Sequence, residues 1–349
     1  MSRIPTIEGF VFTRRLSQSA YCGLWRAVQT TLDRDVLVVV LTDATLADTA
    51  RCGLFYGVAR RLAQSEPQLV PEIIDVIRTE HHGYIILEDA HARPVLDVLA
   101  GHRMTAESAL ALMTRLAEGL AEFRSVHLVY GGLKPKNIYL TEDGEPLLPD
   151  PAAIRYDAGH GDNPAGPPMG SPAFVAPEQY LTPETVDFRA DMFALAMTLY
   201  ALGTGQVPFG ALPADEILSA KLERTVPSPC DLVTNFPKPF AAILAKLAQR
   251  RPENRYADWD DVLFDLHQAK EGILPQGRIY EDSVIAEPRL DLHPEHTIRL
   301  KLRKPNRLPP PHPRKAAYII PVLVALLLIS VALSLFWGIL WLFRKELGL

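Results

Sequence analysis

The chain has 349 residues, a formal net charge of −5 and an apolar fraction of 48%. This length allows about two domains, and the negative charge argues against a nucleic-acid partner. The three cysteines, Cys22, Cys52 and Cys230, lack the close spacing of metal-binding motifs. The sequence therefore predicts a reducing, cytoplasmic setting and no metal site built on cysteine.

The first 90 residues are predicted to be rich in β-strands and to contain one helix. Residues 9–41 alternate apolar and polar side chains and end in a continuous apolar run, which is typical of hairpin strands. Residues 44–65 space their apolar side chains as a helix does. A second pair of strands is predicted at 73–78 and 83–87.

Beyond about residue 92 the pattern becomes helical. Thr105 is expected to cap a helix that carries Leu112, Leu116, Leu120 and Phe123 on one side. Asp143-Gly144 is typical of a tight turn between two short strands. Three further helices are predicted over 188–203, 240–248 and 259–270.

The last part of the chain differs from the rest in composition. Residues 273–315 are polar and proline-rich, which is typical of a stiff, extended linker. Residues 316–343 contain no charged side chain in 28 positions, and a transmembrane helix needs only about 20 apolar residues. A buried core helix is the alternative, but it would rarely be so long. We therefore predict one transmembrane helix, followed by a short tail at 344–349.

The charges beside this segment predict its orientation. Seven basic residues precede it between positions 299 and 315, and only Arg344 and Lys345 follow it, next to Glu346. The positive-inside rule then places the N-terminal bulk in the cytoplasm, and the first ten residues lack the apolar region of a signal peptide. The basic stretch could contact lipid headgroups or form a solvated linker, and both interpretations stay open.

Five short motifs stand out between residues 131 and 256. They are Gly131-Gly132-Leu133-Lys134-Pro135-Lys136-Asn137-Ile138, Leu148-Pro149-Asp150-Pro151-Ala152, Gly170-Ser171-Pro172-Ala173-Phe174-Val175-Ala176-Pro177-Glu178, Arg189-Ala190-Asp191, and Arg255-Tyr256. The first resembles the H-R-D-L-K-P-x-N catalytic loop, and the third ends in the A-P-E of the activation segment. Over roughly residues 9–272 the chain resembles bacterial serine/threonine kinases that end in a membrane helix.

The resemblance implies an α+β, two-lobed protein-kinase-like fold, to which the C-terminal transmembrane helix is added. A strand-rich small lobe is expected at 1–91 and a helical large lobe at 92–272, with a nucleotide cleft between them. Glu178, Asp191 and Arg255 match residues that build the large lobe. Glu178 and Arg255 are expected to form a partly buried ion pair.

Several positions depart from the motifs of active kinases. Gly132 stands where the family has the aspartate that accepts the substrate's hydroxyl proton, and Val39 stands where it has the phosphate-binding lysine. The glutamate that orients this lysine aligns best with Gly57. The glycine-rich loop is replaced by residues 17–22, Ser-Gln-Ser-Ala-Tyr-Cys. No catalytic residue is therefore expected.

Some of the matched positions keep the chemistry of the family. The resemblance makes Asn137 and Asp150 candidate magnesium ligands and Lys134 a candidate phosphate contact, so Mg-ATP could bind with weak affinity. Alternatively, these side chains only hold the loops together. An arginine on a strand beside the altered loop, Arg14, Arg15 or Arg26, could replace the missing lysine or lie in solvent.

Three functions are compatible with this pattern. The first is a membrane-tethered pseudokinase that acts as a scaffold or regulatory module for a partner protein or membrane complex, with residues 316–343 in contact with lipid. The second is a slow or unorthodox ATP-dependent kinase or other nucleotide transferase. The third is a purely structural membrane anchor.

Overall fold

The computed structural model describes residues 6–19, 21–79, 82–151, 154, 156–157, 171–275 and 293–298. The predicted transmembrane helix and its tail lie outside these residues. Among the residues that are described, no helix combines the length and apolar character needed to cross a membrane.

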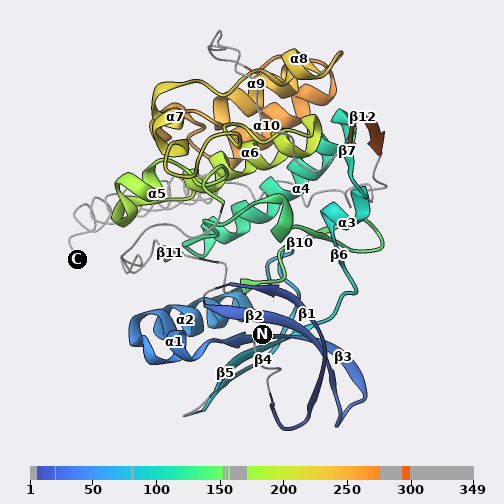
Figure 1. Ribbon diagram of the computed structural model, residues 1–349, viewed down its shortest axis with the longest axis vertical. Coiled ribbons are helices and arrows are strands. Elements are labelled where there is room, and N and C mark those ends of the chain that lie inside the picture. Colours follow the sequence, from blue (N-terminus) through green and yellow to red (C-terminus); the bar gives the residue numbers. More distant parts are fainter. Residues whose placement is uncertain are drawn as a thin grey trace, which may run out of the picture. The chain divides into compact units, whose positions relative to one another are not determined.

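The N-terminal part is built on an antiparallel five-stranded sheet in the order β1-β2-β3-β5-β4 (Figure 1). Its strands are β1 (Phe10–Gln18), β2 (Cys22–Gln29), β3 (Arg34–Leu41), β4 (Ile73–Arg78) and β5 (Gly83–Glu88). Both predicted strand groups are confirmed. The apolar run of β3 is central because β3 pairs with β2 on one side and with β5 on the other.

The helix predicted over 44–65 is two helices, α1 (Asp43–Ala47) and α2 (Thr49–Ser65). The break lies at Asp48, whose extended backbone ends α1 and whose carboxylate accepts the backbone N–H of Arg51 at 3.1 Å. Aspartate is a favoured N-cap residue because its side chain satisfies an orphan N–H of the first turn. The spacing of apolar residues alone could not reveal that one helix ends and another begins at this residue.

The rest of the described chain is mainly helical (Figure 1). The principal helices are α4 (Ala106–Ser125), α6 (Arg189–Thr204), α9 (Lys238–Leu247) and α10 (Trp259–Lys270). The shorter ones are α3 (Val95–Leu99), α5 (Glu178–Leu181), α7 (Ile217–Glu223) and α8 (Pro229–Leu232), with 3-10 turns η1 (Pro135–Asn137), η3 (Pro183–Thr185) and η4 (Pro252–Asn254). The short strands are β6 (Arg93–Pro94), β7 (His102–Met104), β8 (Leu128–Val129), β9 (Tyr139–Leu140), β10 (Pro146–Leu147), β11 (Tyr156–Asp157) and β12 (His293–Ile298).

Most of the predicted helix boundaries agree with the structure. Thr105 caps α4 by accepting the backbone N–H of Ser108 at 3.2 Å, and β9 pairs with β10 around the predicted turn. The end of α6 was predicted at Gly203, but the helix continues to Thr204. Gly205 ends it in the left-handed conformation (φ +76°), which glycine adopts with little strain.

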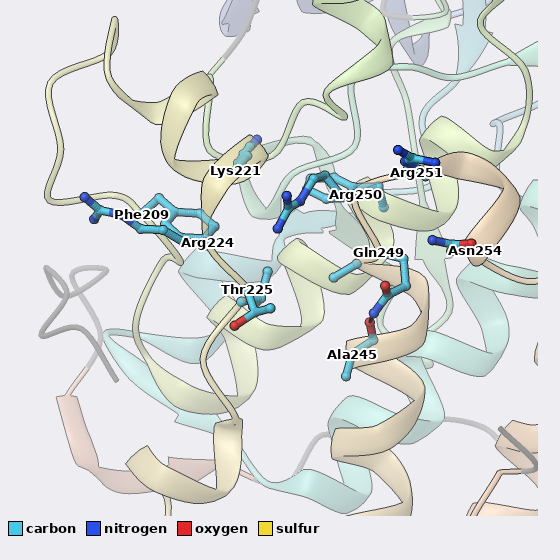
Figure 2. Close-up of a pocket in the computed structure, with 12 residues that line it drawn as sticks. Phe209, Lys221, Arg224, Thr225, Ala245, Gln249, Arg250, Arg251 and Asn254 are labelled. Atoms are coloured by element: carbon cyan, nitrogen blue, oxygen red, sulfur yellow. Dashed lines mark hydrogen bonds between the residues drawn. The ribbon is translucent and has the colours of Figure 1, made fainter. Parts of the chain in front are cut away.

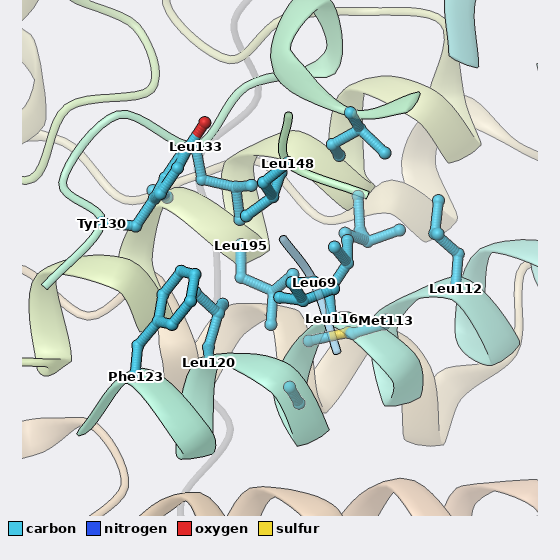
Figure 3. Packing of buried hydrophobic residues seen from close by; sticks show 14 of the residues in the cluster. Leu69, Leu112, Met113, Leu116, Leu120, Phe123, Tyr130, Leu133, Leu148 and Leu195 are labelled. Atoms are coloured by element: carbon cyan, nitrogen blue, oxygen red, sulfur yellow. The ribbon is translucent and has the colours of Figure 1, made fainter. Parts of the chain in front are cut away.

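The main apolar core is centred on α4. Figure 3 shows Leu112, Leu116 and Phe123 of this helix packed towards side chains of the loops and of α6. Leu69, from the segment after α2, inserts so closely that a Cβ on Gly119 would lie 2.2 Å from its Cγ atom. The absence of a side chain at Gly119 is therefore what admits Leu69.

The predicted linker contains one element that the sequence did not indicate. Residues His293–Ile298 form β12, which pairs in parallel with β7 (His102–Met104). An extended segment can pair with the exposed edge of a strand through backbone hydrogen bonds.

Candidate functional site

The catalytic-loop motif is fixed by a carboxylate from α6. Asp191 accepts the backbone N–H groups of Tyr130 at 2.8 Å and of Gly131 at 2.7 Å. Burial raises the pKa of Asp191 to about 7, while these two N–H groups oppose the rise. Gly131 has φ +66°, a conformation that a side chain would strain. Asp191 thus positions the loop.

The other polar groups of this loop also bond within the protein. The Asn137 side-chain amide donates to the Gly132 carbonyl at 2.8 Å. The Gln179 amide donates to the Gly131 carbonyl at 3.0 Å, and its oxygen accepts the Ala176 N–H at 2.9 Å. The role of Gln179 was not predicted from the sequence. The only signal that could have indicated it is its position directly after Glu178 of the A-P-E motif. Gly132 itself adds a backbone carbonyl and no acid or base.

The turn that replaces the glycine-rich loop is closed by its own serine. The Ser19 hydroxyl accepts the backbone N–H groups of Tyr21 at 3.1 Å and of Cys22 at 3.0 Å, and the Ser19 N–H donates to the Cys22 carbonyl at 2.8 Å. Backbone N–H groups of such turns are the donors that hold phosphate oxygens. Here two of them already have an acceptor.

Asp150 lies directly against this turn. The Cys22 thiol is 3.7 and 3.8 Å from the two carboxylate oxygens of Asp150. Burial, followed by the negative charge of Asp150, raises the pKa of the Cys22 thiol, so it stays protonated and donates. The carboxylate expected to bind a metal ion therefore faces a thiol from the altered loop.

Val39 belongs to an apolar cluster. It is fully buried on β3, opposite Leu24 of β2 and Ile85 of β5. The residues of α2 in the same cluster include Phe55 and Val58, and no residue of α2 is acidic. An apolar side chain with apolar neighbours thus stands where the family has its phosphate-binding lysine.

The alignment of Gly57 with the orienting glutamate is not supported. Gly57 is partly exposed on α2, and a Cβ there would meet no atom within 4 Å. The buried side of the helix carries Cys52, Phe55 and Ala59 instead. Gly57 therefore does not occupy the face that packs on the sheet.

Arg26 binds an acid at the junction of the two lobes. Its guanidinium donates from Nε and Nη2 to the two carboxylate oxygens of Asp89, the Nη2 contact being 3.2 Å. Asp89 follows β5 directly and its side chain is 1% exposed. Arg26 is thus held in an ion pair, whereas the sequence alone left it either as a replacement for the missing lysine or as a solvated side chain. The ion pair joins β2 to the segment that connects the lobes.

The predicted pair of Glu178 and Arg255 is present. The guanidinium donates to both carboxylate oxygens, at 2.5 and 2.9 Å. Their side chains are 10% and 0% exposed, so the pair is deeply buried. The same guanidinium donates to the carbonyls of Arg189 at 2.7 Å and Gln249 at 2.9 Å. The pair fastens the end of the activation segment to α6 and to the turn before η4.

The predicted site residues lie in two different surroundings. Three of them belong to the catalytic loop, whereas Val39 and Asp150 contact residues of the small lobe. The Asn137 side chain is hydrogen-bonded to the Gly132 carbonyl, and Lys134 directly precedes the turn η1. Val39 lies in the apolar core of the sheet, while Asp150 is reached by Cys22. The oxygen donors Asn137 and Asp150 fit a magnesium ion. The small lobe, however, has no cation at position 39 for the phosphates, so the residues do not fit the family's mode of Mg-ATP binding.

Comparison with known proteins agrees with the motifs. The family described as "Protein kinase domain" matches residues 59–265. The serine/threonine-protein kinase PknL of Mycobacterium tuberculosis is 25% identical over 272 residues, covering 77% of this chain and 68% of PknL. PknH of Mycobacterium bovis is 30% identical over 166 residues, covering 48% of this chain and 28% of PknH.

Solved structures show the same fold. The crystal structure of a double mutant of the Mycobacterium tuberculosis PknI kinase domain superposes with a TM-score of 0.58, at 19% identity. The superposition covers 77% of this chain and 99% of that domain. The family match begins at residue 59, beyond Val39 and the altered loop, and spans the catalytic-loop, activation-segment and Arg255 motifs. The chain belongs to the protein kinase domain family.

Proposed function

We propose that the chain is a membrane-tethered pseudokinase that acts as a scaffold or regulatory module for a partner protein or a membrane complex. The observation that carries this proposal is the closed phosphate-loop turn. The N–H groups of Tyr21 and Cys22 donate to Ser19, and the Cys22 thiol donates to Asp150. The two N–H groups and the carboxylate, which would hold the phosphates and the metal ion in an active kinase, therefore already have partners within the protein.

The magnitudes support a loss of catalysis. Without a general base at Gly132 the rate falls by about 10²–10⁴, and without a positioned cation at Val39 by about 10²–10³ more. An ordinary kinase rate of about 1–100 s⁻¹ would drop to one turnover in minutes at best. The two factors need not multiply fully, but each is large alone.

The retained residues support a binding role. Asp191, Glu178 and Arg255 are all buried and all bond to loops of the large lobe. They preserve the shape of the domain and the activation-segment surface without taking part in phosphate transfer. The proposed tether is the uncharged segment 316–343, which would hold this domain at the cytoplasmic face of a membrane.

The alternative function is a slow or unorthodox ATP-dependent kinase or another nucleotide transferase. Lys134, Asn137 and Asp150 favour it, because these residue types are kept where the family binds phosphate and magnesium. In that case Cys22 would have to release Asp150, and a cation would have to approach from outside β3.

Thermal unfolding with and without millimolar Mg-ATP separates the two functions. A ligand at about 100 times its Kd stabilises the folded state by about 2.7 kcal/mol. The pseudokinase proposal predicts no rise in Tm. A rise that disappears in the Asp150→Ala variant would contradict it and favour the enzyme.

A further inference from the structure

A second site lies in the large lobe, where α6, α7 and α9 meet the turn η4. A cavity of about 240 Å³ opens there between Phe193 of α6, Arg224 after α7, and a group of four residues around the start of η4 (Figure 2), which are Gln249, Arg250, Arg251 and Asn254. This volume is below the roughly 300–1,000 Å³ of pockets that hold drug-sized ligands. The cavity therefore suits a small chemical group.

The lining of this cavity combines apolar surface with four cationic side chains. Arg224, Arg250 and Arg251 line it together with Lys221, and none of its twelve described lining residues is acidic. In the part of the chain that the structure describes, no carboxylate forms an ion pair with any of the three arginines. Natural surfaces usually intersperse charges of both signs, so this concentration of one sign indicates an anionic ligand.

Figure 2 shows how the donors are arranged. The Arg250 side chain reaches across the middle of the cavity, between Lys221 and Thr225, while Arg251 and Asn254 lie on one side of it. Planar guanidinium groups bind phosphate oxygens through paired N–H donors. The Asn254 amide adds a neutral donor on the same side as Arg251 (Figure 2).

Lys221 connects this cavity to the activation segment. Its ammonium group donates to the carbonyls of Pro172 at 2.5 Å and Val175 at 2.6 Å. The pKa of Lys221 is lowered to about 7, mainly by burial, while the charge of Glu178 opposes this shift and the charge of Arg255 adds to it. An anion in the cavity would help to keep Lys221 charged and bonded to this segment.

We propose that this cavity binds a phosphate monoester, as carried by a phosphorylated serine or threonine side chain of a protein. The exposed rim is formed by arginines and Asn254 and not by apolar side chains, which argues against a lipid headgroup with its acyl chains. The overall charge of −5 argues against nucleic acid. This site is separate from the nucleotide region, so the proposal stands whether or not the chain transfers phosphate.

The test measures binding of a fluorescent phosphoserine peptide and its unphosphorylated twin to the full-length chain. The Arg250→Ala variant should bind the phosphopeptide about tenfold more weakly, because a hydrogen bond to a charged group contributes about that factor. The matched control is Arg60→Ala with Arg93→Ala, which removes two exposed arginines outside the cavity. It should leave binding unchanged, and inorganic phosphate should compete with the peptide.

Three results would overturn the proposal. The first is equal affinity of the chain for the two peptides, and the second is equal affinity of the Arg250→Ala variant and the unmodified chain for the phosphopeptide. The third is arginine-dependent binding only to vesicles that contain anionic lipids, which would make the cavity a membrane contact. Because Arg250 is exposed, its variant should unfold at the Tm of the unmodified chain, which confirms that any loss reflects binding.

Discussion

The substitution Glu178→Gln should destabilise the large lobe. Of the carboxylates discussed above, Glu178 is the one whose loss of charge should lower the stability most. Arg255 has a fully buried side chain, and Glu178 is its only acidic partner among the described residues. Glutamine retains the shape and one oxygen acceptor but leaves the guanidinium charge uncompensated. Breaking a buried pair in this way costs about 3–5 kcal/mol, which corresponds to a fall in Tm of roughly 10 °C for a chain of this size.

The assay is thermal unfolding of residues 1–302, which contain both lobes in one compact unit. The matched control is Glu253→Gln, the same substitution at an exposed carboxylate in η4, which should change Tm by no more than about 1–2 °C. Replacing the pair together, by Glu178→Leu with Arg255→Met, should restore part of the loss, because the uncompensated guanidinium charge at position 255 is then removed as well. Equal Tm values for Glu178→Gln and Glu253→Gln would refute the reasoning.

Two further predictions concern stability. Gly119→Ala should destabilise the fold by about 1–3 kcal/mol through overpacking against Leu69. Gly57→Ala, whose Cβ meets open space, should stabilise α2 by up to about 1 kcal/mol. Denaturant unfolding measures both changes, and a Gly119→Ala variant that is more stable than the unmodified chain would contradict the packing. The pKa of Asp191 is raised from 3.8 to about 7 by burial, so the folded state keeps a proton that the unfolded state releases between these values. The free energy of unfolding should therefore fall by up to about 1.4 kcal/mol per pH unit as the pH rises from about 4 to about 7, compared with that of an Asp191→Asn variant. If the two proteins show the same dependence of this free energy on pH, the raised pKa of Asp191 is excluded as its cause.

The fold could be predicted because its signals are local or repeated. The apolar run of β3 and the helical spacing of α4 identify buried elements by period alone. The ordered motifs around Asn137, Glu178 and Arg255 then identify the arrangement. The break at Asp48 was missed because a cap depends on one side chain and interrupts no apolar period.

From the sequence, the altered site could be described only by the functional groups that it lacks. Val39 and Gly132 show in the sequence that a cation and a carboxylate are missing, but they do not show what replaces them. The bonds of Ser19 to its own turn and of Cys22 to Asp150 depend on backbone direction and on segments far apart in the chain. Arg26 was considered as a replacement for the lysine, and its pairing with Asp89 required the position of the segment after β5.

Transfer of the γ-phosphate of ATP by the purified full-length chain tests the central claim most directly. The measurement follows labelled phosphate on the chain itself and on a general protein substrate, with the Asp150→Ala variant as the background. The account predicts equal incorporation by both proteins, because Gly132 supplies no base and Val39 no phosphate-binding cation. Sustained transfer by the unmodified chain that is abolished by Asp150→Ala would contradict the account and identify the chain as an active enzyme.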